Sequence, residues 1–340
     1  MPINMEMNTA IIGLGYWGKN LLRNVVLNHQ TSKLFICDTD QDRMYAADSM
    51  YKVTGGYSNP EKVFENEDIN NVIIATPTKT HFKLAYQALN AGKNVLVEKP
   101  MTTSSEETKT LIALAEEKNK ILMVDHVYLY NPAVLKLKQL INDTQKIGPI
   151  NYIDSTRINL GIYQEDVNVL WDLACHDISI INYLIHETPT SVRAIGRINP
   201  HHGVEDIAYL FMQYPSDLLV QVNSSWASPV KMRKMIIGGG KQMIIYDDIE
   251  PTNKLTIYDY ESKVIDDRNK SKLTDYRLGN ISLPKYEPEE ALKNVISSFY
   301  ASVVSGIPPL ADGKNALEVI KILESAQESL KLGGLNVPIA

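Results

Sequence analysis

The chain contains 340 residues, of which 44% are apolar and 22% charged, and its 34 basic and 40 acidic side chains give a net charge of −6. This composition supplies a sizeable core and excludes global disorder, and the length suits two domains of ordinary size. The negative charge gives no bulk attraction for nucleic acid or anionic lipid, and no apolar run approaches the roughly 20 residues that span a bilayer. The two cysteines, Cys37 and Cys175, lie far apart in the sequence and form neither a disulfide framework nor a zinc ribbon. Because the N-terminus lacks the basic segment of a signal peptide, we expect a soluble, cytoplasmic protein.

Short apolar runs alternate with longer amphipathic segments over the first 125 residues. The runs are nearly continuous in Val, Ile, Leu and Ala, which is typical of strands that are covered on both faces. They predict strands at Thr9–Ile12, Leu34–Cys37, Val72–Ala75, Val95–Glu98 and Ile121–Val124, and a weaker strand near Tyr51–Val53. Strands and helices that alternate at this spacing indicate βαβ units, so we predict a doubly wound parallel sheet for residues 1–125.

The helices between these strands have recognisable ends. Asn59-Pro60-Glu61 predicts an N-cap followed by proline in the first turn, and Ala91-Gly92 predicts the C-terminus of another helix. Ser104 and Glu107 have the spacing of a capping box before a helix at Thr108–Lys118.

The pattern changes after residue 125 and predicts a second domain of α+β type over residues 126–340. Residues Ile150–Leu160 alternate with a period of two, and Ser191–Asp259 reads as consecutive strands joined by turns at Pro215-Ser216-Asp217, Ser228-Pro229 and Gly238-Gly239-Gly240. Helices are predicted at Pro132–Asp143, Val169–Ile185, Pro288–Val304 and Asn315–Leu332. The polar stretch Glu261–Ser282 is expected to be a surface excursion. We therefore predict a mostly antiparallel sheet with helices on one face.

A dinucleotide-binding motif lies between the first predicted strand and the helix after it. Gly13-Leu14-Gly15-Tyr16-Trp17-Gly18 matches G-x-G-x-x-G, and Asp38 ends the next strand 20 residues after Gly18. The glycines allow a tight turn and close approach of the backbone to a pyrophosphate, and Asp38 would accept hydrogen bonds from ribose hydroxyls and repel a 2′-phosphate. Because Thr39-Asp40 brings no arginine directly after Asp38, NAD is favoured over NADP. The alternative interpretation is a structural glycine turn in an α/β protein.

Two further segments follow predicted strands of the parallel sheet, where open α/β sheets bind their ligands. Ala75-Thr76-Pro77 follows one strand and Glu98-Lys99-Pro100 follows the next. A lysine at this edge could polarise or orient a reacting oxygen. An ordinary solvated lysine is an equal alternative on the sequence alone.

Asp172 and His176 lie four residues apart in a predicted helix that is otherwise apolar, so both side chains share one face. A histidine beside a carboxylate is oriented and made more basic, which suits proton abstraction from a hydroxyl. Two alternatives are a buried polar stripe and a pair of metal ligands. The metal interpretation lacks an HExxH arrangement or a nearby cysteine pair, so we predict no metal. His201-His202 falls in a predicted loop and is expected at the surface.

Together these segments resemble the Gfo/Idh/MocA family, named for glucose–fructose oxidoreductase and inositol dehydrogenase. The resemblance covers essentially the whole chain, from Gly13–Gly18 through Glu98-Lys99-Pro100 to Trp171–Asp177. It implies a Rossmann domain that binds NAD, and a second domain that binds substrate and forms a homodimer or homotetramer through a large open sheet. It also implies Lys99, Asp172 and His176 as the catalytic residues and a cis Lys99–Pro100 bond. Cys175 is a departure, since close relatives carry proline before the histidine.

Within the family, the chain resembles the enzymes that oxidise C3 of UDP-N-acetylglucosamine and related nucleotide sugars to a 3-keto sugar for later amination. The supporting stretches are Gly15–Asn20, Tyr130–Pro132, Asn159–Gly161 and Asp166–Asn168. A nucleotide sugar needs its diphosphate held, and Arg157, Lys231 and Arg233 are candidates because guanidinium and ammonium groups suit phosphate oxygens. Each could equally face solvent or pair with a carboxylate. The alternative functions are a dehydrogenase of a free polyol, inositol or sugar phosphate, and a non-enzymatic NAD-binding sensor.

These arguments define two predicted sets of site residues, and Lys99 belongs to both. The cofactor set is Gly13, Gly15, Tyr16, Trp17, Gly18, Asp38, Arg43, Thr76, Pro77, His81, Glu98 and Lys99. The substrate set is Lys99, Arg157, Asn168, Asp172, His176, Lys231 and Arg233.

Overall fold

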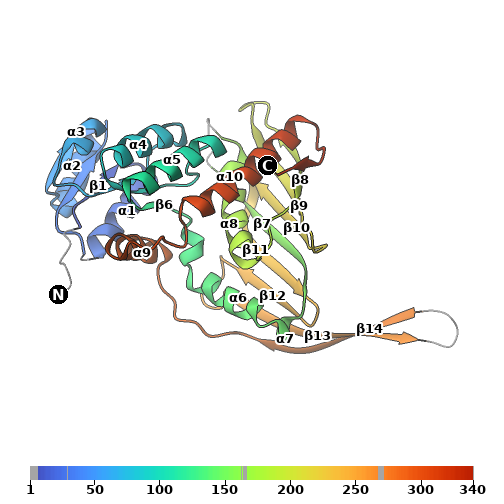
Figure 1. Ribbon diagram of the computed structural model, residues 1–340. Coiled ribbons are helices and arrows are strands. Elements are labelled where there is room, and N and C mark those ends of the chain that lie inside the picture. The colour runs from blue at the N-terminus through green and yellow to red at the C-terminus, as the bar shows by residue number, and fades with distance from the viewer. Residues whose placement is uncertain (1–6, 29, 162, 164–166, 267–271, 340) are drawn as a thin grey trace. The chain divides into compact units, whose positions relative to one another are not determined.

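The computed structural model describes residues 7–28, 30–161, 163, 167–266 and 272–339. The chain divides into two compact units: residues 1–131 with 289–324 form the first, and residues 132–288 with 325–340 form the second (Figure 1). Residues 289–324, which the sequence analysis assigned to the second domain, therefore group with the first unit. Within the described ranges, no helix is both long enough and apolar enough to cross a membrane.

A parallel sheet of six strands forms the centre of the first unit, in the order β3-β2-β1-β4-β5-β6. Its strands are β1 (Thr9–Ile12), β2 (Leu34–Cys37), β3 (Gly55–Tyr57), β4 (Asn71–Ile74), β5 (Asn94–Val97) and β6 (Leu122–Val124). Every residue of β1, β4 and β5 is buried, as expected for strands with both faces covered. The predicted doubly wound parallel sheet is confirmed.

Helices follow the strands of this sheet at the predicted spacing. They are α1 (Tyr16–Leu27), α2 (Gln41–Tyr51), α3 (Pro60–Glu65), α4 (His81–Asn90) and α5 (Ser105–Lys118). The predicted N-caps Asn59 and Ser104 are confirmed, because the Asn59 side chain accepts a hydrogen bond from the backbone N–H of Glu61 at 3.0 Å and Ser104 accepts one from Glu107 at 3.4 Å. The second bond of the predicted capping box is replaced, since the Ser104 N–H donates to Thr102 Oγ1 at 3.1 Å, and α5 begins at Ser105 rather than Thr108. The strand predicted near Tyr51–Val53 was wrong, since Tyr51 ends α2 and β3 begins only at Gly55.

The helix α9 (Ala291–Ser305), the last helix but one of the chain, belongs to the first unit through polar contacts. The hydroxyl of Tyr300 lies 2.8 Å from the hydroxyls of both Thr9 and Thr31. Glu290, which caps α9, forms an ion pair with Arg23 of α1 and accepts a hydrogen bond from Asn24 at 3.1 Å. These contacts attach a segment late in the sequence to the first strand and helix of the chain.

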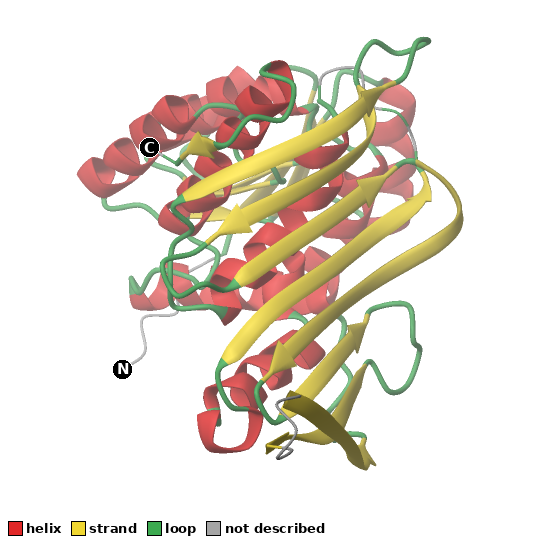
Figure 2. Cartoon of the chain, turned by 90° about the vertical axis from the view of Figure 1, so that its right-hand side faces the viewer, coloured by secondary structure: helices red, strands yellow, loops and turns green. Residues whose placement is uncertain are grey.

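A nine-stranded sheet dominates the second unit, in the order β14-β13-β12-β11-β7-β10-β9-β8-β15 (Figure 2). Its strands are β7 (Ile150–Leu160), β8 (Ser191–Ile198), β9 (Glu205–Gln213), β10 (Leu219–Ser225), β11 (Ala227–Gly239), β12 (Gln242–Asp247), β13 (Leu255–Asp266), β14 (Lys272–Ser282) and β15 (Val337–Pro338). All neighbouring strands are antiparallel except β7 and β10, which are parallel. The mostly antiparallel sheet predicted for this region is confirmed.

One face of this sheet is buried and the other carries exposed apolar side chains. Along β9 the side chains alternate between buried and exposed positions, so that Leu210 is buried while Tyr209 and Phe211 are 43% and 38% exposed. The helices that follow or precede the strands of this unit are α6 (Pro132–Asn142), α7 (Thr144–Ile147), α8 (Cys175–Leu184) and the end of α10 (Gly313–Lys331). Figure 2 shows the strands of this sheet in front, with helices behind them.

Three details of the second unit differ from the sequence prediction. Ser228-Pro229, predicted as a turn, lies inside β11 at a register shift between Ala227 and Met232. Such a bulge accommodates the proline, which cannot donate a hydrogen bond to the neighbouring strand. The stretch Glu261–Ser282, predicted as a surface excursion, contains the end of β13 and the whole of β14, which pair with each other. The helix predicted as Val169–Ile185 consists of a π-helical turn at Leu170–Ala174 followed by α8.

Candidate active site

The three glycines of the dinucleotide motif have different surroundings. Gly13 has φ +92°, and a Cβ atom there would lie 2.6 Å from the carbonyl oxygen of Ala75. A Cβ on Gly18 would lie 1.9 Å from the carbonyl oxygen of Gly13, so packing of the turn itself requires these two glycines. A Cβ on Gly15 would meet no described atom within 4 Å. The open space at Gly15 fits the predicted role, which is close approach of the loop backbone to a pyrophosphate.

The Asp38 carboxylate lies at the end of β2, beside the glycine loop. Its Oδ2 accepts the backbone N–H of Leu14 at 2.6 Å and its Oδ1 accepts that of Asp40 at 2.9 Å. Arg43 reaches the same region: its guanidinium lies 3.1 Å from an Asp40 oxygen and 3.9 Å from Asp38 Oδ2. A carboxylate fixed by two backbone donors is preorganised to accept hydrogen bonds from ribose hydroxyls, which agrees with NAD as the cofactor.

The rest of the predicted cofactor set belongs to the first unit and divides into exposed and buried groups. Tyr16 and Trp17 are 78% and 44% exposed, with their rings edge to face at 5.5 Å. His81 is buried, and its two ring nitrogens lie 2.9 Å from the Pro100 carbonyl oxygen and 2.8 Å from that of Thr76. His81 therefore connects the segments after β4 and β5.

Lys99 and three titratable residues lie at the carboxyl ends of β5 and β6. Lys99 is half-buried, its bond to Pro100 is cis, and its backbone N–H donates to Glu98 Oε2 at 3.1 Å. Asp125 and His126 follow β6 directly and are buried. The sequence analysis did not select these two residues, although the rule that selected Thr76 and Lys99, a polar residue directly after a parallel strand, applies to them as well.

Asp172 and His176 are positioned where the π-helical turn meets α8 in the second unit. The turn contains Asp172, and His176 is the second residue of α8; both side chains are half-buried. The indole N–H of the buried Trp226 donates to Asp172 Oδ2 at 2.9 Å. A π-helical turn is an irregularity that often marks functional sites, and here it includes the predicted orienting carboxylate. The sequence analysis missed Trp226, because no local pattern connects it to a residue 54 positions away.

Asn168 lies just before this turn and holds it in place. Its Oδ1 accepts the backbone N–H of Leu170 at 3.1 Å, and its Nδ2 donates to Glu205 and Gln327 at 2.7 and 2.8 Å. These contacts explain its burial and give it a capping role. Asp166, part of the stretch quoted for the nucleotide-sugar enzymes, lies outside the described residues.

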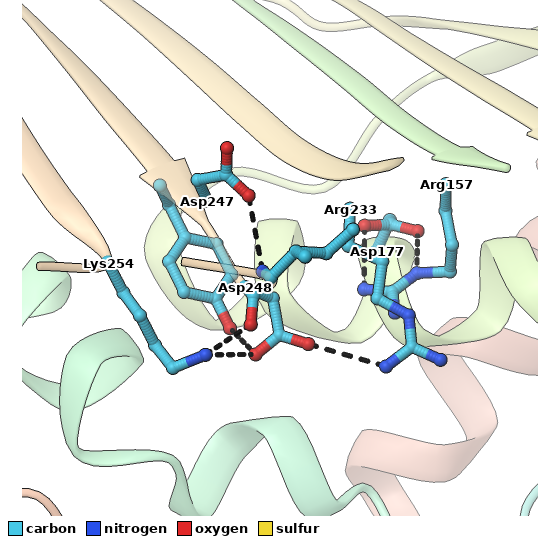
Figure 3. Close-up of polar contacts among 8 residues, drawn as sticks. Arg157, Asp177, Arg233, Asp247, Asp248 and Lys254 are labelled. Carbon is cyan, nitrogen blue, oxygen red and sulfur yellow. Dashed lines mark hydrogen bonds and ion pairs between the residues drawn. The ribbon is translucent and has the colours of Figure 1, made fainter. Parts of the chain in front are cut away.

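The three cations predicted to hold a diphosphate differ in their surroundings, and Figure 3 shows two of them, Arg157 and Arg233. Arg157 is 2% exposed and forms a bidentate ion pair with Asp177, at 2.6 and 3.1 Å. Arg233 lies 3.4 Å from an oxygen of Asp248. For both arginines the structure therefore shows the second of the two predicted alternatives, pairing with a carboxylate. Lys231 is exposed.

Lys99 thus belongs to the first unit, and Asp172 and His176 belong to the second. In the described part of the chain, no group of three or more His, Cys, Asp or Glu side chains has an arrangement that could hold a metal ion. His201 and His202 are exposed, and His202 stacks on Tyr163 at 4.0 Å between ring centroids.

Both halves of the chain match known protein families. Residues 7–126 match the oxidoreductase family with an NAD-binding Rossmann fold, and residues 134–245 match the GFO/IDH/MocA C-terminal domain. The chain is 31% identical to scyllo-inositol 2-dehydrogenase (NAD(+)) of Bacillus subtilis over 68% of this chain and 72% of that protein. It is 28% identical to UDP-N-acetylglucosamine 3-dehydrogenase of Acidithiobacillus ferrooxidans over 56% of this chain, a match that spans 58% of that protein.

A solved structure shares the fold over nearly the full length. GenD2 from gentamicin A biosynthesis, in complex with NAD, superposes with a TM-score of 0.83 at 19% identity and covers 98% of this chain and 97% of its own. The glycine loop and Asp38 fit the nucleotide that this Rossmann fold binds, and both domains of the family are present. The chain belongs to the Gfo/Idh/MocA family of NAD-dependent oxidoreductases.

Proposed function

We propose that this protein oxidises a secondary hydroxyl, at C3, of a nucleotide-activated sugar such as UDP-N-acetylglucosamine, and produces a 3-keto sugar. The observation that carries the proposal is the Asp172–His176 segment, in which a buried indole fixes a carboxylate four residues before a histidine. An oxidoreductase of alcohols needs a base of this kind for the hydroxyl proton. The similarity to the A. ferrooxidans enzyme supports the choice of a nucleotide sugar.

Each proposed catalytic residue has one task. His176 accepts the proton of the substrate hydroxyl, and Asp172 orients the imidazole and stabilises its protonated form. Lys99 donates a hydrogen bond to the same oxygen and stabilises the charge that develops on it. NAD, when bound, supplies the acceptor for the hydride that leaves the carbon. Asp38 binds the ribose hydroxyls, and the Gly15 backbone approaches the pyrophosphate.

A second candidate substrate is a free polyol, inositol or sugar phosphate. Two observations favour it: the B. subtilis inositol dehydrogenase is as similar to this chain as the nucleotide-sugar enzyme, and Arg157 and Arg233 both pair with carboxylates. A free polyol has no diphosphate for these cations to neutralise.

The experiment that separates the candidates incubates the purified protein with NAD and either UDP-N-acetylglucosamine or scyllo-inositol. NADH absorbance and the mass of the sugar are then measured. NADH formation with loss of two hydrogens from the nucleotide sugar supports the first candidate. Turnover of scyllo-inositol alone would replace it with the second.

We also propose that the protein forms a homodimer or homotetramer through the open face of the nine-stranded sheet. The support is its exposed apolar side chains, 38–59% exposed, which include Tyr152, Ile195, Tyr209, Phe211 and Leu219. Light scattering during size-exclusion chromatography tests this, since Phe211→Glu should lower the mass. Tyr45→Glu, at an exposed position of α2, is the matched control.

A further inference from the structure

Two carboxyl side chains end neighbouring strands of the first unit, next to Lys99. Val97 of β5 is in register with Val124 of β6, so Glu98 and Asp125 are the next residues of adjacent parallel strands. Their exposures are only 7% and 3%. The two carboxyls lie close enough for a hydrogen bond between them, and Glu98 also accepts the backbone N–H of Lys99. We call these two residues the Glu98–Asp125 pair.

A hydrogen bond between two carboxyls requires a proton. Two ionised carboxylates offer only acceptors, so one member of the pair must be protonated for the contact to form. Within the described residues, Glu98 Oε1 and Asp125 Oδ1 have no hydrogen-bond partner that could stabilise a second negative charge. Burial, followed by the charge of Asp125, raises the pKa of Glu98 well above its ordinary value, and burial raises the pKa of Asp125 to about 7.

Four charged or titratable groups of the described residues lie near the pair, two of them next to it in the sequence. Lys99 is the cation, and its charge lowers the pKa of both carboxyls against the larger effect of burial. His126 is buried, and burial with the charge of Lys99 lowers its pKa to about 3, so it is neutral at physiological pH. Tyr130, in the turn after β6, and Asp312, whose backbone pairs with that of Met123, complete this environment. The negative charge of the pair therefore has Lys99 as its cationic neighbour.

We propose that Glu98 and Asp125 share one proton in the folded protein, and that the single negative charge left on the pair is the counter-charge that positions the Lys99 ammonium. Asp125 is then a positioning residue, since it acts through Glu98 and Lys99 and does not touch the substrate. The shared proton follows from the side chains of the first unit alone. The importance of Lys99 for turnover rests on the proposed function.

Infrared spectroscopy of the whole protein tests the shared proton. At about pH 8 ordinary carboxyls are ionised, whereas the pair should still show the carbonyl stretch of a protonated carboxyl. The band should be absent from the double variant Glu98→Gln/Asp125→Asn and retained in Glu106→Gln, which removes an exposed carboxylate of α5. If the wild-type protein lacks the band, or the double variant keeps it, the shared proton is excluded. The wild-type measurement needs no variant to fold.

Chemical labelling of Lys99 tests the second part without requiring turnover. Trace acetic anhydride acylates only the neutral amine, so mass spectrometry of the Lys99 peptide gives its reactivity as a function of pH. Loss of a nearby opposite charge shifts such a titration by about one pH unit or more. We expect the Lys99 curve of the double variant to move at least that far toward lower pH, which is roughly tenfold faster labelling near neutrality. An unmoved curve would overturn the counter-charge role while leaving the shared proton intact.

Two further comparisons keep these outcomes apart. If the double variant does not fold, the apolar variant Glu98→Met/Asp125→Leu, which also removes both carboxyls, should move the labelling curve in the same direction, and an unmoved curve again overturns the role. Failure of the wild-type protein to oxidise any sugar would remove the proposed function but would not alter the infrared or labelling results. The pair and the proposed reaction are therefore tested independently.

Discussion

Replacing Asp125 by asparagine should make the stability of the protein less sensitive to pH. In the unfolded chain an aspartate releases its proton near its ordinary pKa of 3.8, whereas in the folded protein burial raises the pKa of Asp125 to about 7. Between these two values the folded state binds more protons than the unfolded state. The free energy of unfolding therefore falls as pH rises through this window, and it stops falling above the folded-state pKa.

The size of the effect follows from the two pKa values. Between about pH 5 and pH 8, the ionisation of Asp125 stabilises the unfolded state more than the folded state. The difference corresponds to about two pH units of titration. At about 1.4 kcal/mol per unit, the wild-type protein should lose roughly 2.5 kcal/mol over this range through Asp125 alone. Asp125→Asn abolishes this loss. It also removes the charge that helps to raise the pKa of Glu98, which changes the difference between the two proteins in the same direction.

Equilibrium urea unfolding, followed by circular dichroism at about pH 5 and about pH 8, measures the effect. The quantity of interest is the change in the free energy of unfolding between the two pH values in each protein, because the contributions of the titrating groups outside the Glu98–Asp125 pair are common to both proteins and cancel. Glu106→Gln, which removes an exposed carboxylate, should follow the wild-type protein. Equal losses of stability in the wild-type and Asp125→Asn proteins would refute the argument, since they would mean that Asp125 ionises alike in both states.

Three further predictions concern the second unit. His176→Ala should lower turnover by roughly 10²–10⁴-fold while NAD binding, measured by calorimetry, stays unchanged. The control His201→Ala removes an exposed histidine. Equal turnover in both variants would exclude His176 as the base. Trp226→Phe removes the donor to Asp172 but keeps an aromatic ring, and should lower turnover about tenfold with an unchanged NAD affinity; if turnover is unaffected, the indole has no orienting role. Arg157→Met leaves the buried Asp177 carboxylate without its cationic partner and should cost about 3–5 kcal/mol in urea unfolding, most of which Arg157→Met/Asp177→Leu should recover. A loss of under about 1 kcal/mol would contradict this.

The parts of the fold that could be predicted are those that depend on local sequence. The bounds of β1 and β2 agree with the apolar runs, because a strand buried on both faces has no polar positions to obscure its ends. The strand β3 escaped prediction because Gly55-Gly56-Tyr57 is short, lies at the sheet edge and carries no apolar run. The return of α9 to the first unit could not be predicted either. It depends on the contact of Tyr300 with Thr9, and no pattern within either segment records a partner 291 positions away.

The candidate site shows the same division between local and long-range information. Gly13 and Asp38 were found from the glycine motif and its spacing, and Lys99 was found because topology alone brings the carboxyl ends of parallel strands to one edge of the sheet. That rule gives the position of a residue and not its role. It was also applied incompletely, since it did not select Asp125, which follows the neighbouring strand and forms a carboxyl pair with Glu98. Without Asp125, the neighbouring Glu98 and Lys99 would be interpreted as a simple ion pair.

The burial of Arg157 could be predicted from the alternation of β7, although the identity of its partner could not. Arg157 occupies the same face of the strand as Ile153 and Ser155, both of which are buried, so the period of two predicts that its guanidinium faces the interior. A buried arginine requires a carboxylate, and here Asp177 supplies it from α8, one residue after His176. Arg157 therefore fixes the beginning of the helix that carries the proposed base. We therefore expect Arg157, first selected as a substrate ligand, to hold the proposed base His176 in position, so that its replacement should lower both stability and turnover.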